Sequence, residues 1–325
     1  MNKELKNVCA VIATYNRKEP LSKCLSYLRL CNSLDAVYLI DNASNDGTTN
    51  LLINESYITE FPPLNSNEIW ETSSNVKNQN GKTIKFYYRR NVTNGGSAGG
   101  FHDGIMEAYK EGYKWIWVLD NDSIPKKNSL DKLLEKTELS ENIGFLCSKV
   151  LWCDGNVHIM NIPQIQPLVK DIPFNQFENS NVSVIRACSW LSLLIKREVI
   201  EEVGLPLKEF FVWAEDIEYT NRMTENNYLG LYVADSIVYH ETKKNYSDDI
   251  IAADVENIMK YSFGIRNNLY LMKQRSILLF ILLLGYNLIF VNFNILKNRK
   301  DNKLKFFWTN TLSSIKSIFF RPGKD

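Results

Sequence analysis

Apolar and polar positions form alternating blocks along the chain, and these blocks predict strands and helices in turn. Short apolar runs predict strands, whereas apolar residues three or four positions apart, as at Leu21, Cys24, Leu25 and Leu28, predict a helix. Strands are expected at 8–13, 36–40, 85–88, 115–119 and 231–239, and helices at 20–31, 48–54 and 101–113. This alternation predicts an α/β fold with a mostly parallel sheet and helices on both faces.

Polar clusters follow the first, second and fourth of these expected strands. In open parallel sheets, ligands bind beyond the carboxyl ends of the strands, so we expect the functional site at that edge. Residues 55–81 are polar and rich in asparagine, and we expect a long loop there. The sequence gives that segment no role.

Asp120 and Asp122 come directly after the expected strand 115–119, with Asn121 between them. Two carboxylates at a strand end can hold one Mg²⁺ or Mn²⁺ ion, because these cations take oxygen ligands and keep positions open for phosphates. A solvated turn or a helix N-cap would use the same residue types, so the pattern alone leaves that alternative open.

Two further clusters could contact a nucleotide. Asp41 opens the stretch DNASNDGT at a strand end, where it can accept hydrogen bonds from a base or ribose, although an Asx-rich turn is equally compatible. Residues 89–101 combine two arginines with four glycines, which allow the backbone to approach a ligand closely. A flexible loop is the alternative there. The stretch matches neither GxGxxG nor a P-loop, which disfavours a dinucleotide-binding fold and a P-loop NTPase.

A carboxylate cluster at Glu215, Asp216 and Glu218 lies in aromatic surroundings. Burial and like charge would raise the pKa of such carboxyls into the range of a general base. If the segment is helical, Glu215, Glu218 and Arg222 lie near one face, so a surface salt-bridge network is the alternative.

Composition narrows the function classes. The 325 residues carry 38 basic and 37 acidic side chains, 45% are apolar, and only three are histidine. The near-neutral charge argues against a nucleic-acid-coating protein, and the apolar content argues against disorder. A His-rich zinc site is disfavoured, and His240, after the strand 231–239, is more simply structural. Six cysteines without a CxxC pair, and no signal-peptide core, favour a cytosolic location.

The charge is unevenly distributed along the chain. Residues 266–325 carry 11 basic and two acidic side chains, for a formal charge of +9, and the preceding residues carry 27 and 35, for −8. Residues 276–296 form an uncharged apolar run, and the stretch after it mixes aromatics with lysines, as membrane-surface helices do. We therefore divide the chain into 1–265 and 266–325. We expect the second part to attach peripherally to the inner face of the cell membrane; a helix packed on the body and a true span are alternatives.

Six pieces, taken in order, resemble the inverting glycosyltransferases of family 2, which have the Rossmann-like GT-A fold. The pieces are VIATYNR, LIDNASNDGT, RRNVTNGGSAGGF, GYKWIWVLDND, GLPLKEFFVWAEDIEY and YVADSIVYHET, and the resemblance as a whole extends over roughly residues 7–270. The stretches GGSAGGF and GLP…EFF…ED.EY are most similar to bacterial galactofuranosyl- and rhamnosyltransferases. Those enzymes build surface polysaccharides, such as O-antigen and capsule, on lipid-linked acceptors. Asn121 stands where many relatives have an aspartate, but the outer carboxylates carry the metal in the family.

The resemblance implies a role for each matching position. Asp120, Asp122 and His240 would hold Mn²⁺ or Mg²⁺, and Asp216 would be the catalytic base, with Glu215 beside it. The nucleotide-sugar would contact Thr14, Asn16, Arg17, Asp41, Arg90, Asn91, Gly95, Gly96 and Asn121. Trp190 and Trp213 would be stacking walls of the acceptor site, although both could equally belong to the core.

The implied activity is inverting transfer of a sugar from a UDP- or dTDP-sugar to a lipid-linked saccharide. UDP-galactofuranose is the first candidate donor and dTDP-rhamnose the second. A non-catalytic subunit of a polysaccharide assembly complex and a nucleotidyltransferase are the competing classes. The latter would need a phosphate-gripping basic signature near the N-terminus, which the sequence lacks. No nucleic-acid partner is expected, and a homo-oligomer is left open.

Overall fold

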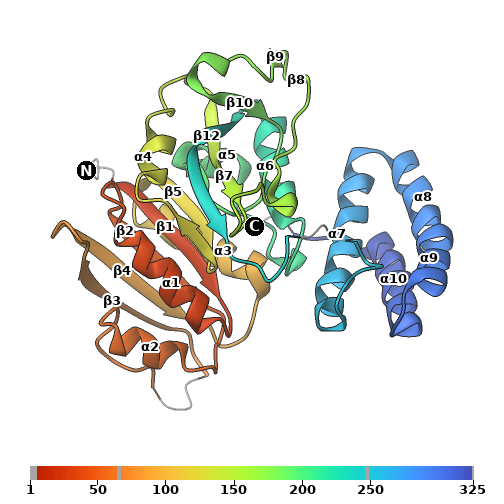
Figure 1. Ribbon diagram of the computed structural model, residues 1–325, viewed down its shortest axis with the longest axis horizontal. Helices are drawn as coiled ribbons and strands as arrows, with labels where there is room; N and C mark the ends of the chain where they lie inside the picture. Colours follow the sequence, from red (N-terminus) through yellow and green to blue (C-terminus); the bar gives the residue numbers. More distant parts are fainter. Residues whose placement is uncertain (1–5, 64–66, 246–248, 324–325) are drawn as a thin grey trace.

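A computed structural model describes residues 6–63, 67–245 and 249–323 and is built around a ten-stranded sheet (Figure 1). The strand order is β10-β12-β7-β11-β5-β1-β2-β4-β3, with β6 paired to β12, and β8 and β9 form a separate two-stranded sheet. The strands are β1 Lys6–Thr14, β2 Ala36–Asp41, β3 Trp70–Lys77, β4 Thr83–Arg90, β5 Tyr113–Asp120, β6 Ser123–Pro125, β7 Ile143–Leu151, β8 Leu168–Val169, β9 Ile172–Pro173, β10 Val182–Ile185, β11 Leu193–Lys196 and β12 Leu229–His240.

Helices cover both faces of the sheet. They are α1 Lys18–Leu28, α2 Thr48–Asn54, α3 Gly96–Lys110, α4 Ser129–Leu134, α5 Arg197–Val203, α6 Glu215–Glu225, α7 Ile258–Arg275, α8 Ile277–Tyr286, α9 Asn292–Asn298 and α10 Lys303–Phe319. Alternate residues of β1 join two different clusters, one with α1, α2 and α4 and one with α3, α5 and α6. Side chains on a strand point alternately to opposite faces, so each face has its own apolar core.

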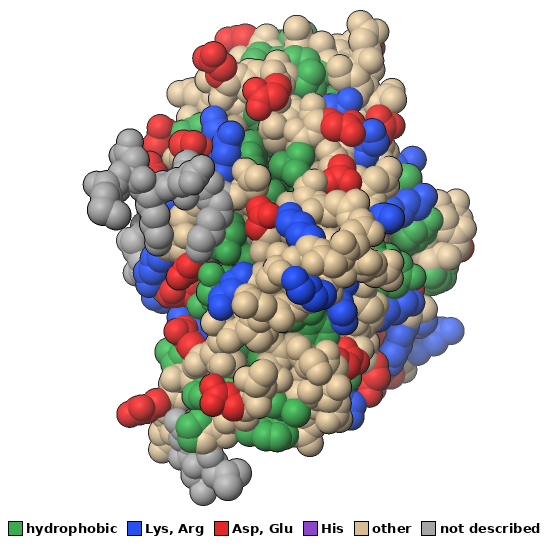
Figure 2. Space-filling model, turned by 90° about the vertical axis from the view of Figure 1, so that its left-hand side faces the viewer, with side chains coloured by type: hydrophobic (Ala, Val, Ile, Leu, Met, Phe, Trp, Pro, Cys, Tyr) green, Lys and Arg blue, Asp and Glu red, His purple; other side chains and the backbone are tan. Residues whose placement is uncertain are grey.

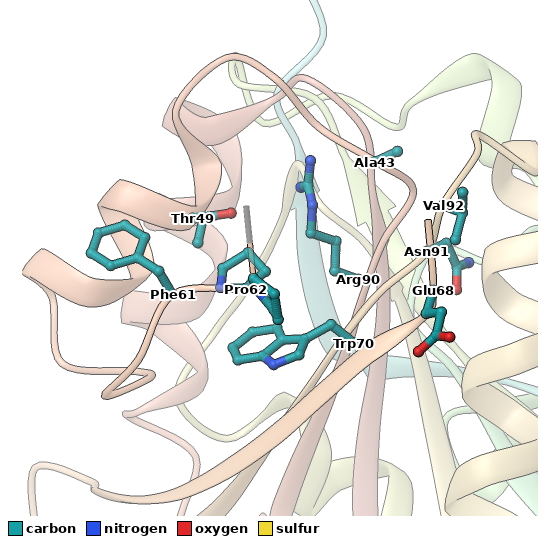
Figure 3. A pocket seen from close by; sticks show the side chains of 10 residues that line it. Ala43, Thr49, Phe61, Pro62, Glu68, Trp70, Arg90, Asn91 and Val92 are labelled. Carbon is teal, nitrogen blue, oxygen red and sulfur yellow. The ribbon is translucent and has the colours of Figure 1, made fainter. Parts of the chain in front are cut away.

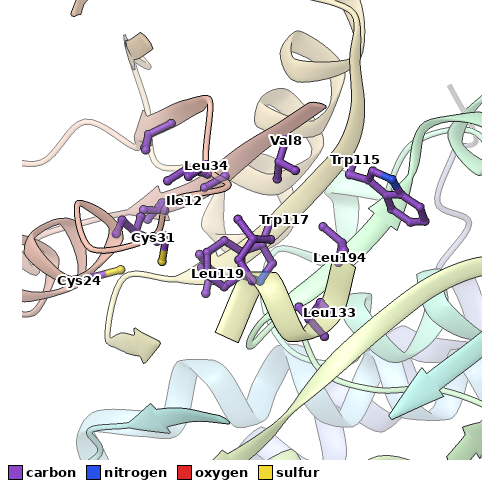
Figure 4. Packing of buried hydrophobic residues seen from close by; sticks show 14 of the residues in the cluster. Val8, Ile12, Cys24, Cys31, Leu34, Trp115, Trp117, Leu119, Leu133 and Leu194 are labelled. Atoms are coloured by element: carbon purple, nitrogen blue, oxygen red, sulfur yellow. The ribbon is translucent and has the colours of Figure 1, made fainter. Parts of the chain in front are cut away.

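The parallel strands that the apolar runs predicted form the centre of the sheet. β5, β1, β2 and β4 are parallel neighbours, whereas β3 and β11 run antiparallel to theirs. Trp117 and Leu119 of β5 are fully buried, and Figure 4 shows them packed with Val8, Ile12 and Leu194. Parallel strands buried on both faces lack polar alternation, which is why their continuous apolar runs are legible in the sequence.

The expectation of a long loop at 55–81 is wrong, because Trp70–Lys77 forms the edge strand β3. Exposure alternates along β3, and within it Val76 is buried while Trp70 packs against the core. The other positions of β3 are polar, since an edge strand has one face in solvent. Residues 64–66 of the expected loop lie outside the described part.

The glycine-rich stretch was expected to precede a helix starting near 101, but α3 already begins at Gly96. Gly96 has a φ of +72°, and a Cβ there would lie 2.0 Å from the backbone oxygen of Phe211. A Cβ on Gly100 would lie 2.6 Å from that of Ala13, so two of the four glycines allow close packing of the first turns of a helix, and the stretch is not a flexible loop.

Helices α7–α10, which we call the C-terminal unit, lie to one side of the sheet body (Figure 1). α8, a π-helical segment at Asn287–Val291 and α9 form one continuous apolar helix, Ile277–Asn298, of 22 residues with mean hydropathy 2.0. Among the described residues it is the one helix long and apolar enough to cross a membrane by length and composition. Only 11% of its apolar window is buried, so the alternative of a helix packed into the body is wrong. α7 runs across the expected boundary at 265/266.

Candidate active site

The carboxyl ends of three parallel strands bring the predicted polar residues to one edge of the sheet. In the register of the strands, Thr14 of β1 pairs with Asp41 of β2, and Ala13 pairs with Asp120 of β5. The turns that follow these strands therefore meet at this edge, as ligand sites do in open α/β sheets.

Asp122, Arg17 and His240 are in direct contact at this edge. Arg17 Nη2 lies 2.6 Å from Asp122 Oδ2, and His240 Nε2 lies 3.4 Å from Asp122 Oδ1. Burial raises the pKa of Asp122, but the hydrogen bond and charge of His240 and the charge of Arg17 outweigh it, and the net pKa is lowered. Asp120 is in the same field: burial, then the charge of Asp122, raises its pKa to about 7.

His240, the last residue of β12, is held in a fixed orientation. Its Nδ1 pairs with Asn161 Oδ1 at 2.9 Å, and its ring lies 4.4 Å from that of His158, centroid to centroid. Burial, then the charge of His240, lowers the pKa of His158 to about 4. The hydrogen bond at Nδ1 leaves Nε2 facing Asp122, the orientation that a histidine ligand needs.

The donor set at this edge has the chemistry that a hard divalent cation requires. Two carboxylates and an imidazole nitrogen are suitable ligands, and the 3.4 Å between His240 Nε2 and Asp122 Oδ1 is close to the ~3 Å between neighbouring ligands of one ion. Within residues 6–63, 67–245 and 249–323, however, no three His, Cys, Asp or Glu side chains are gathered tightly enough to hold a metal ion. Arg17 occupies the Oδ2 side of Asp122 in this conformation, and a cation held by these residues stays a prediction.

Glu215 and Asp216 are the first two residues of α6. Ser97 Oγ donates to Glu215 Oε1 at 2.5 Å, and the backbone N–H of Ile217 donates to Asp216 Oδ1 at 2.7 Å. Burial raises the pKa of Glu215 to about 6, and burial followed by the charge of Glu215 raises the pKa of Asp216 to about 7. A carboxylate with a pKa near neutrality can exchange protons at physiological pH, which suits a general base.

The alternative for this cluster was a surface salt-bridge network of Glu215, Glu218 and Arg222. Only the pair of Glu218 and Arg222 forms. Arg222 Nη2 lies 2.9 Å from Glu218 Oε2, one helical turn away. Glu215 takes no part in it, because the residue is 2% exposed and its carboxylate accepts a hydrogen bond from Ser97 Oγ. Glu218 is therefore structural, and Glu215 and Asp216 are set apart from it.

Asp41 does not reach out toward a ligand as expected. Its carboxylate has no exposed surface and accepts hydrogen bonds from Tyr88 Oη at 2.7 Å, Arg90 Nη1 at 2.9 Å and the backbone N–H of Ser44 at 2.8 Å. The expected contact with a base is thus absent from this conformation. Asp41 instead fixes the guanidinium of Arg90, which also donates to the backbone oxygen of Ser44.

Three of the residues expected at the nucleotide tie strands and turns together. Asn121 Nδ2 donates to the backbone oxygen of Ala13 at 3.1 Å and to Thr14 Oγ1 at 3.3 Å, and Thr14 is buried. Asn16, with a φ of 50°, accepts from the backbone N–H of Asn45 at 2.7 Å. Asn16 and Asn121 are half-buried, so parts of their surfaces remain accessible beside the carboxylates.

Asn91 and the glycines lie on the other side of the same edge. Asn91 Nδ2 donates to Asn42 Oδ1 and to Asp103 Oδ2, both at 3.1 Å. Asn42 Nδ2 in turn donates to the backbone oxygen of Gly96 at 2.8 Å. Gly95 precedes α3 as its N-cap residue, so the start of α3 is connected to the turn after β2.

A cavity of about 550 Å³ opens beside Arg90. Figure 3 shows Thr49, Pro62, Arg90 and Trp70 around the same hollow. Trp70 pairs with Arg90 across β3 and β4, and its ring contacts that of Tyr88 edge-on at 5.8 Å. The sequence did not predict that the 55–81 segment lines this cavity, because the strand β3 within it is largely polar.

The two tryptophans expected at an acceptor differ in exposure. Trp190 is 3% exposed and packs between Phe101 and Tyr219, so it belongs to the core and its ring cannot stack on a sugar in this conformation. Trp213 is half-buried and contacts Tyr261 edge-on at 4.9 Å.

Residues 65–204 match the model of glycosyl transferase family 2. The match covers less than half of the chain, and no curated protein matches it. Together with the GT-A fold, this family 2 match supports a glycosyltransferase.

Several solved glycosyltransferase structures share the fold. GalNAc-T7 with UDP, GalNAc and Mn²⁺ gives a TM-score of 0.57 at 16% identity, over 84% of this chain and 48% of that chain. S. aureus TarS 1–349 in complex with UDP gives 0.53 at 15%, over 96% and 81%. Mannosyltransferase PcManGT from Pyrobaculum calidifontis, in complex with GDP-Man and Mn²⁺, gives 0.52 at 12%, over 98% and 77%. The chain thus spans about half the length of GalNAc-T7, and at these identities the likeness shows the GT-A fold alone.

The family 2 resemblance missed Lys260 of α7. Burial, then the charge of Arg17, lowers the pKa of Lys260, while Asp122 and Asp120 act on it in the opposite direction. Its amine therefore lies in the field of the carboxylate edge. Nothing in the sequence around Lys260 separates it from the other lysines, because its proximity comes from the packing of α7.

Proposed function

We propose that this chain is an inverting, metal-dependent glycosyltransferase that transfers a sugar from a nucleotide-sugar to a lipid-linked saccharide acceptor. The family 2 match and the GT-A fold support the enzyme class. The observation that carries the proposal is the cluster at the carboxyl edge of the sheet, where Asp122 contacts Arg17 and His240 and where Asp120 ends β5. UDP-galactofuranose is the first candidate donor, because GGSAGGF and GLP…EFF…ED.EY resemble galactofuranosyltransferases, and dTDP-rhamnose is the second.

Asp216 is proposed as the base. Its carboxylate accepts the proton of the acceptor hydroxyl as the hydroxyl oxygen attacks the anomeric carbon, opposite the leaving nucleoside diphosphate. One base and one displacement invert the configuration at that carbon. Glu215, anchored by Ser97, helps to keep the pKa of Asp216 near neutrality.

Asp120, Asp122 and His240 are proposed to hold Mn²⁺ or Mg²⁺. When bound, the ion would supply positive charge that stabilises the leaving diphosphate. Mn²⁺ is present in the GalNAc-T7 and PcManGT structures, which supports a divalent ion here. Arg17 is proposed to line the nucleotide pocket, with Arg90 and Asn91 beside the diphosphate and sugar.

A panel of UDP-, dTDP- and GDP-sugars, with Mn²⁺ or Mg²⁺, tests this function by release of nucleoside diphosphate. We expect one donor to be turned over, and only with metal. Asp216→Asn should bind that donor normally and lose about 10²–10⁴-fold in turnover, whereas exposed Asp254→Asn should match the wild type. Wild-type turnover in Asp216→Asn would reject the base. Calorimetry that detects no nucleotide binding would favour the non-catalytic subunit.

Attachment to the inner face of the cell membrane through the C-terminal unit is proposed as well. The apolar side chains of the helix Ile277–Asn298 and of α10 point outward, to an unusual extent for a water-soluble surface. They include Ile277, Leu278, Leu282, Ile289 and Phe293 on one helix and Leu304, Trp308, Leu312 and Phe319 on the other, each at least 51% exposed. Lysines at the helix ends add attraction to anionic lipid. A lipid-linked acceptor would bring the substrate to the same surface.

Flotation with vesicles of phosphatidylglycerol and phosphatidylcholine tests the attachment. Leu282→Asp combined with Phe293→Asp should remain in the unbound fraction. Ile162→Asp, an equally exposed position on the sheet body, should float with the vesicles like the wild type. Equal flotation of all three proteins would reject the C-terminal unit as the attachment surface.

A further inference from the structure

The turn of residues 210–214 leads directly into the proposed base Asp216, and its backbone is strained. Phe211, Trp213 and Ala214 have φ angles of 65°, 66° and 70°, in the left-handed region that residues with side chains rarely occupy. Such a conformation persists only where surrounding contacts hold it. The groups that hold this turn therefore fix the entry to α6 and, with it, the position of Asp216.

Asn267 of α7 holds the turn from one side. Its side chain has no exposed surface, and its Nδ2 lies 3.0, 3.1 and 2.7 Å from the backbone oxygens of Phe210, Val212 and Trp213. Three carbonyl groups of one turn thus converge on a single amide donor. The side-chain amide of Asn267 therefore fixes the distance between the turn and α7.

Two neighbours on α7 complete this contact. Arg266 Nη2 donates to the backbone oxygens of Glu209 at 2.8 Å and Phe210 at 3.2 Å. A Cβ on Gly264 would lie 2.6 Å from the ring of Trp213, so the absence of a side chain there allows the indole to rest on the helix. The α7 surface is therefore shaped to this turn, by hydrogen bonds and by close packing.

The start of α3 holds the opposite side of the turn. The backbone N–H of Ala98 donates to the backbone oxygen of Phe211 at 3.1 Å, and Ser97 donates to Glu215. A Cβ on Gly96 would lie 2.0 Å from the same Phe211 oxygen. The turn is thus held between the glycine-rich start of α3 on one side and Arg266 and Asn267 of α7 on the other.

We propose that Asn267 is a positioning residue for the transfer reaction, holding the 210–214 turn so that Asp216 stays at the carboxyl edge of the sheet. Asn267 acts through the backbone of the turn. Because it lies on the first helix of the C-terminal unit, that unit contributes to catalysis as well as to attachment. The proposal rests on the proposed function, in which Asp216 is the base.

Asn267→Ala in the full-length chain tests the proposal, with Asn268→Ala as its matched control. Asn268 is the next residue of the same helix and is exposed. For Asn267→Ala we expect kcat of transfer to fall about 10²-fold, the effect of a misplaced catalytic group. KM for the donor and the affinity for UDP with Mn²⁺ should stay unchanged, as a purely structural defect would not allow. Asn268→Ala should behave as the wild type.

Wild-type kcat in Asn267→Ala would overturn the proposal. If Asn267→Ala does not fold, Asn267→Ser replaces it, because the hydroxyl keeps one donor in the site but cannot serve all three carbonyl oxygens. A fall in kcat with unchanged UDP binding then supports the proposal, and full turnover overturns it. The parallel Asp216→Asn measurement separates the two ideas: turnover in that variant rejects the proposed base, whereas an inactive Asp216→Asn beside a fully active Asn267→Ala rejects only the positioning role.

Discussion

In the sheet body the fully buried side chains are mainly large and apolar, whereas in α10 of the C-terminal unit the buried ones are mainly small or polar. Trp117, Phe86 and Phe145 represent the body. The buried residues of α10 are Phe306, Asn310, Ser313, Ser314 and Ser317. Figure 2 shows basic and acidic side chains interspersed over the face of the body that lies away from the unit.

The types of buried side chain in the two parts differ in the way expected for folds in water and in lipid. Burial of large apolar side chains stabilises a fold because water surrounds it. Helices in lipid lack that driving force and associate through small residues and interhelical hydrogen bonds. In the unit, Asn310 Nδ2 donates to Asn292 Oδ1 and to the backbone oxygen of Asn287, both at 2.9 Å. This arrangement of side chains supports the proposal that the outer face of the unit contacts membrane lipid.

Two tryptophan substitutions make the sharpest test of this comparison. Trp117→Ala removes a fully buried ring whose Nε1 donates to Ser192 Oγ, and should cost about 3–5 kcal/mol of unfolding free energy in a urea titration. Trp308→Ala, 56% exposed, should leave the urea midpoint unchanged and weaken vesicle flotation. A large loss of stability from Trp308→Ala in water would break the comparison.

Asn310→Ala should destabilise the unit by about 1–3 kcal/mol, because it leaves Asn292 and the Asn287 carbonyl without their donor. Thermal unfolding followed in detergent measures this loss. Asn298→Ala, an exposed asparagine of the same unit, is the control and should leave the melting temperature unchanged. Equal melting temperatures for both variants would show that the hydrogen bonds of Asn310 with Asn292 and Asn287 do not stabilise the unit.

The two parts should also differ in their response to pH. Burial and Glu215 raise the pKa of Asp216 to about 7, and a base must be deprotonated to act, so kcat/KM should fall about tenfold per pH unit below pH 7 and level off above it. Residues 276–325 contain no histidine, and their acidic residues are Asp301 and Asp325. Vesicle flotation should therefore be constant between pH 6 and 8. If flotation and kcat/KM fell together as the pH is lowered, the loss of activity could not be assigned to Asp216 in the sheet body.

Salt should have the smallest effect. Raising ionic strength screens the lysines at the ends of the helices and should weaken flotation only partly, by about 1 kcal/mol per lysine at the surface. Arg299 should add nothing to this, because it is 3% exposed and donates to the backbone oxygens of residues 250, 251 and 253. Complete release by salt alone would show that the apolar face is not inserted.

The central strands and the carboxylate edge could be predicted from the sequence because both depend on local pattern. Strands buried on both faces are apolar throughout, and Asp120 and Asp122 follow one of them directly. The edge strand β3 was missed, since its outward positions read as loop. Its wall of the cavity beside Arg90 was missed for the same reason.

Partners distant in sequence explain the remaining differences. Asp41 was expected to face a ligand, but Tyr88 and Arg90 enclose it, and no local pattern shows such pairing. Asn267 reads as one polar helical residue among many, because its three backbone partners lie more than 50 positions away. The roles of Asp216 and His240 stay predictions that the experiments above test.

The π-helical segment at Asn287–Val291 sets the rotational phase of the apolar helix. An α-helix turns about 100° per residue, so Asn292 and Ile295 would lie about 120° and 60° around the axis from Phe280 in a regular helix. A π turn absorbs about one residue, which brings both to within about 40° of Phe280. These three are the buried side chains of that helix. One extra residue in the backbone thus keeps the three buried side chains on one face along the 22 residues. The other faces of the helix point outward.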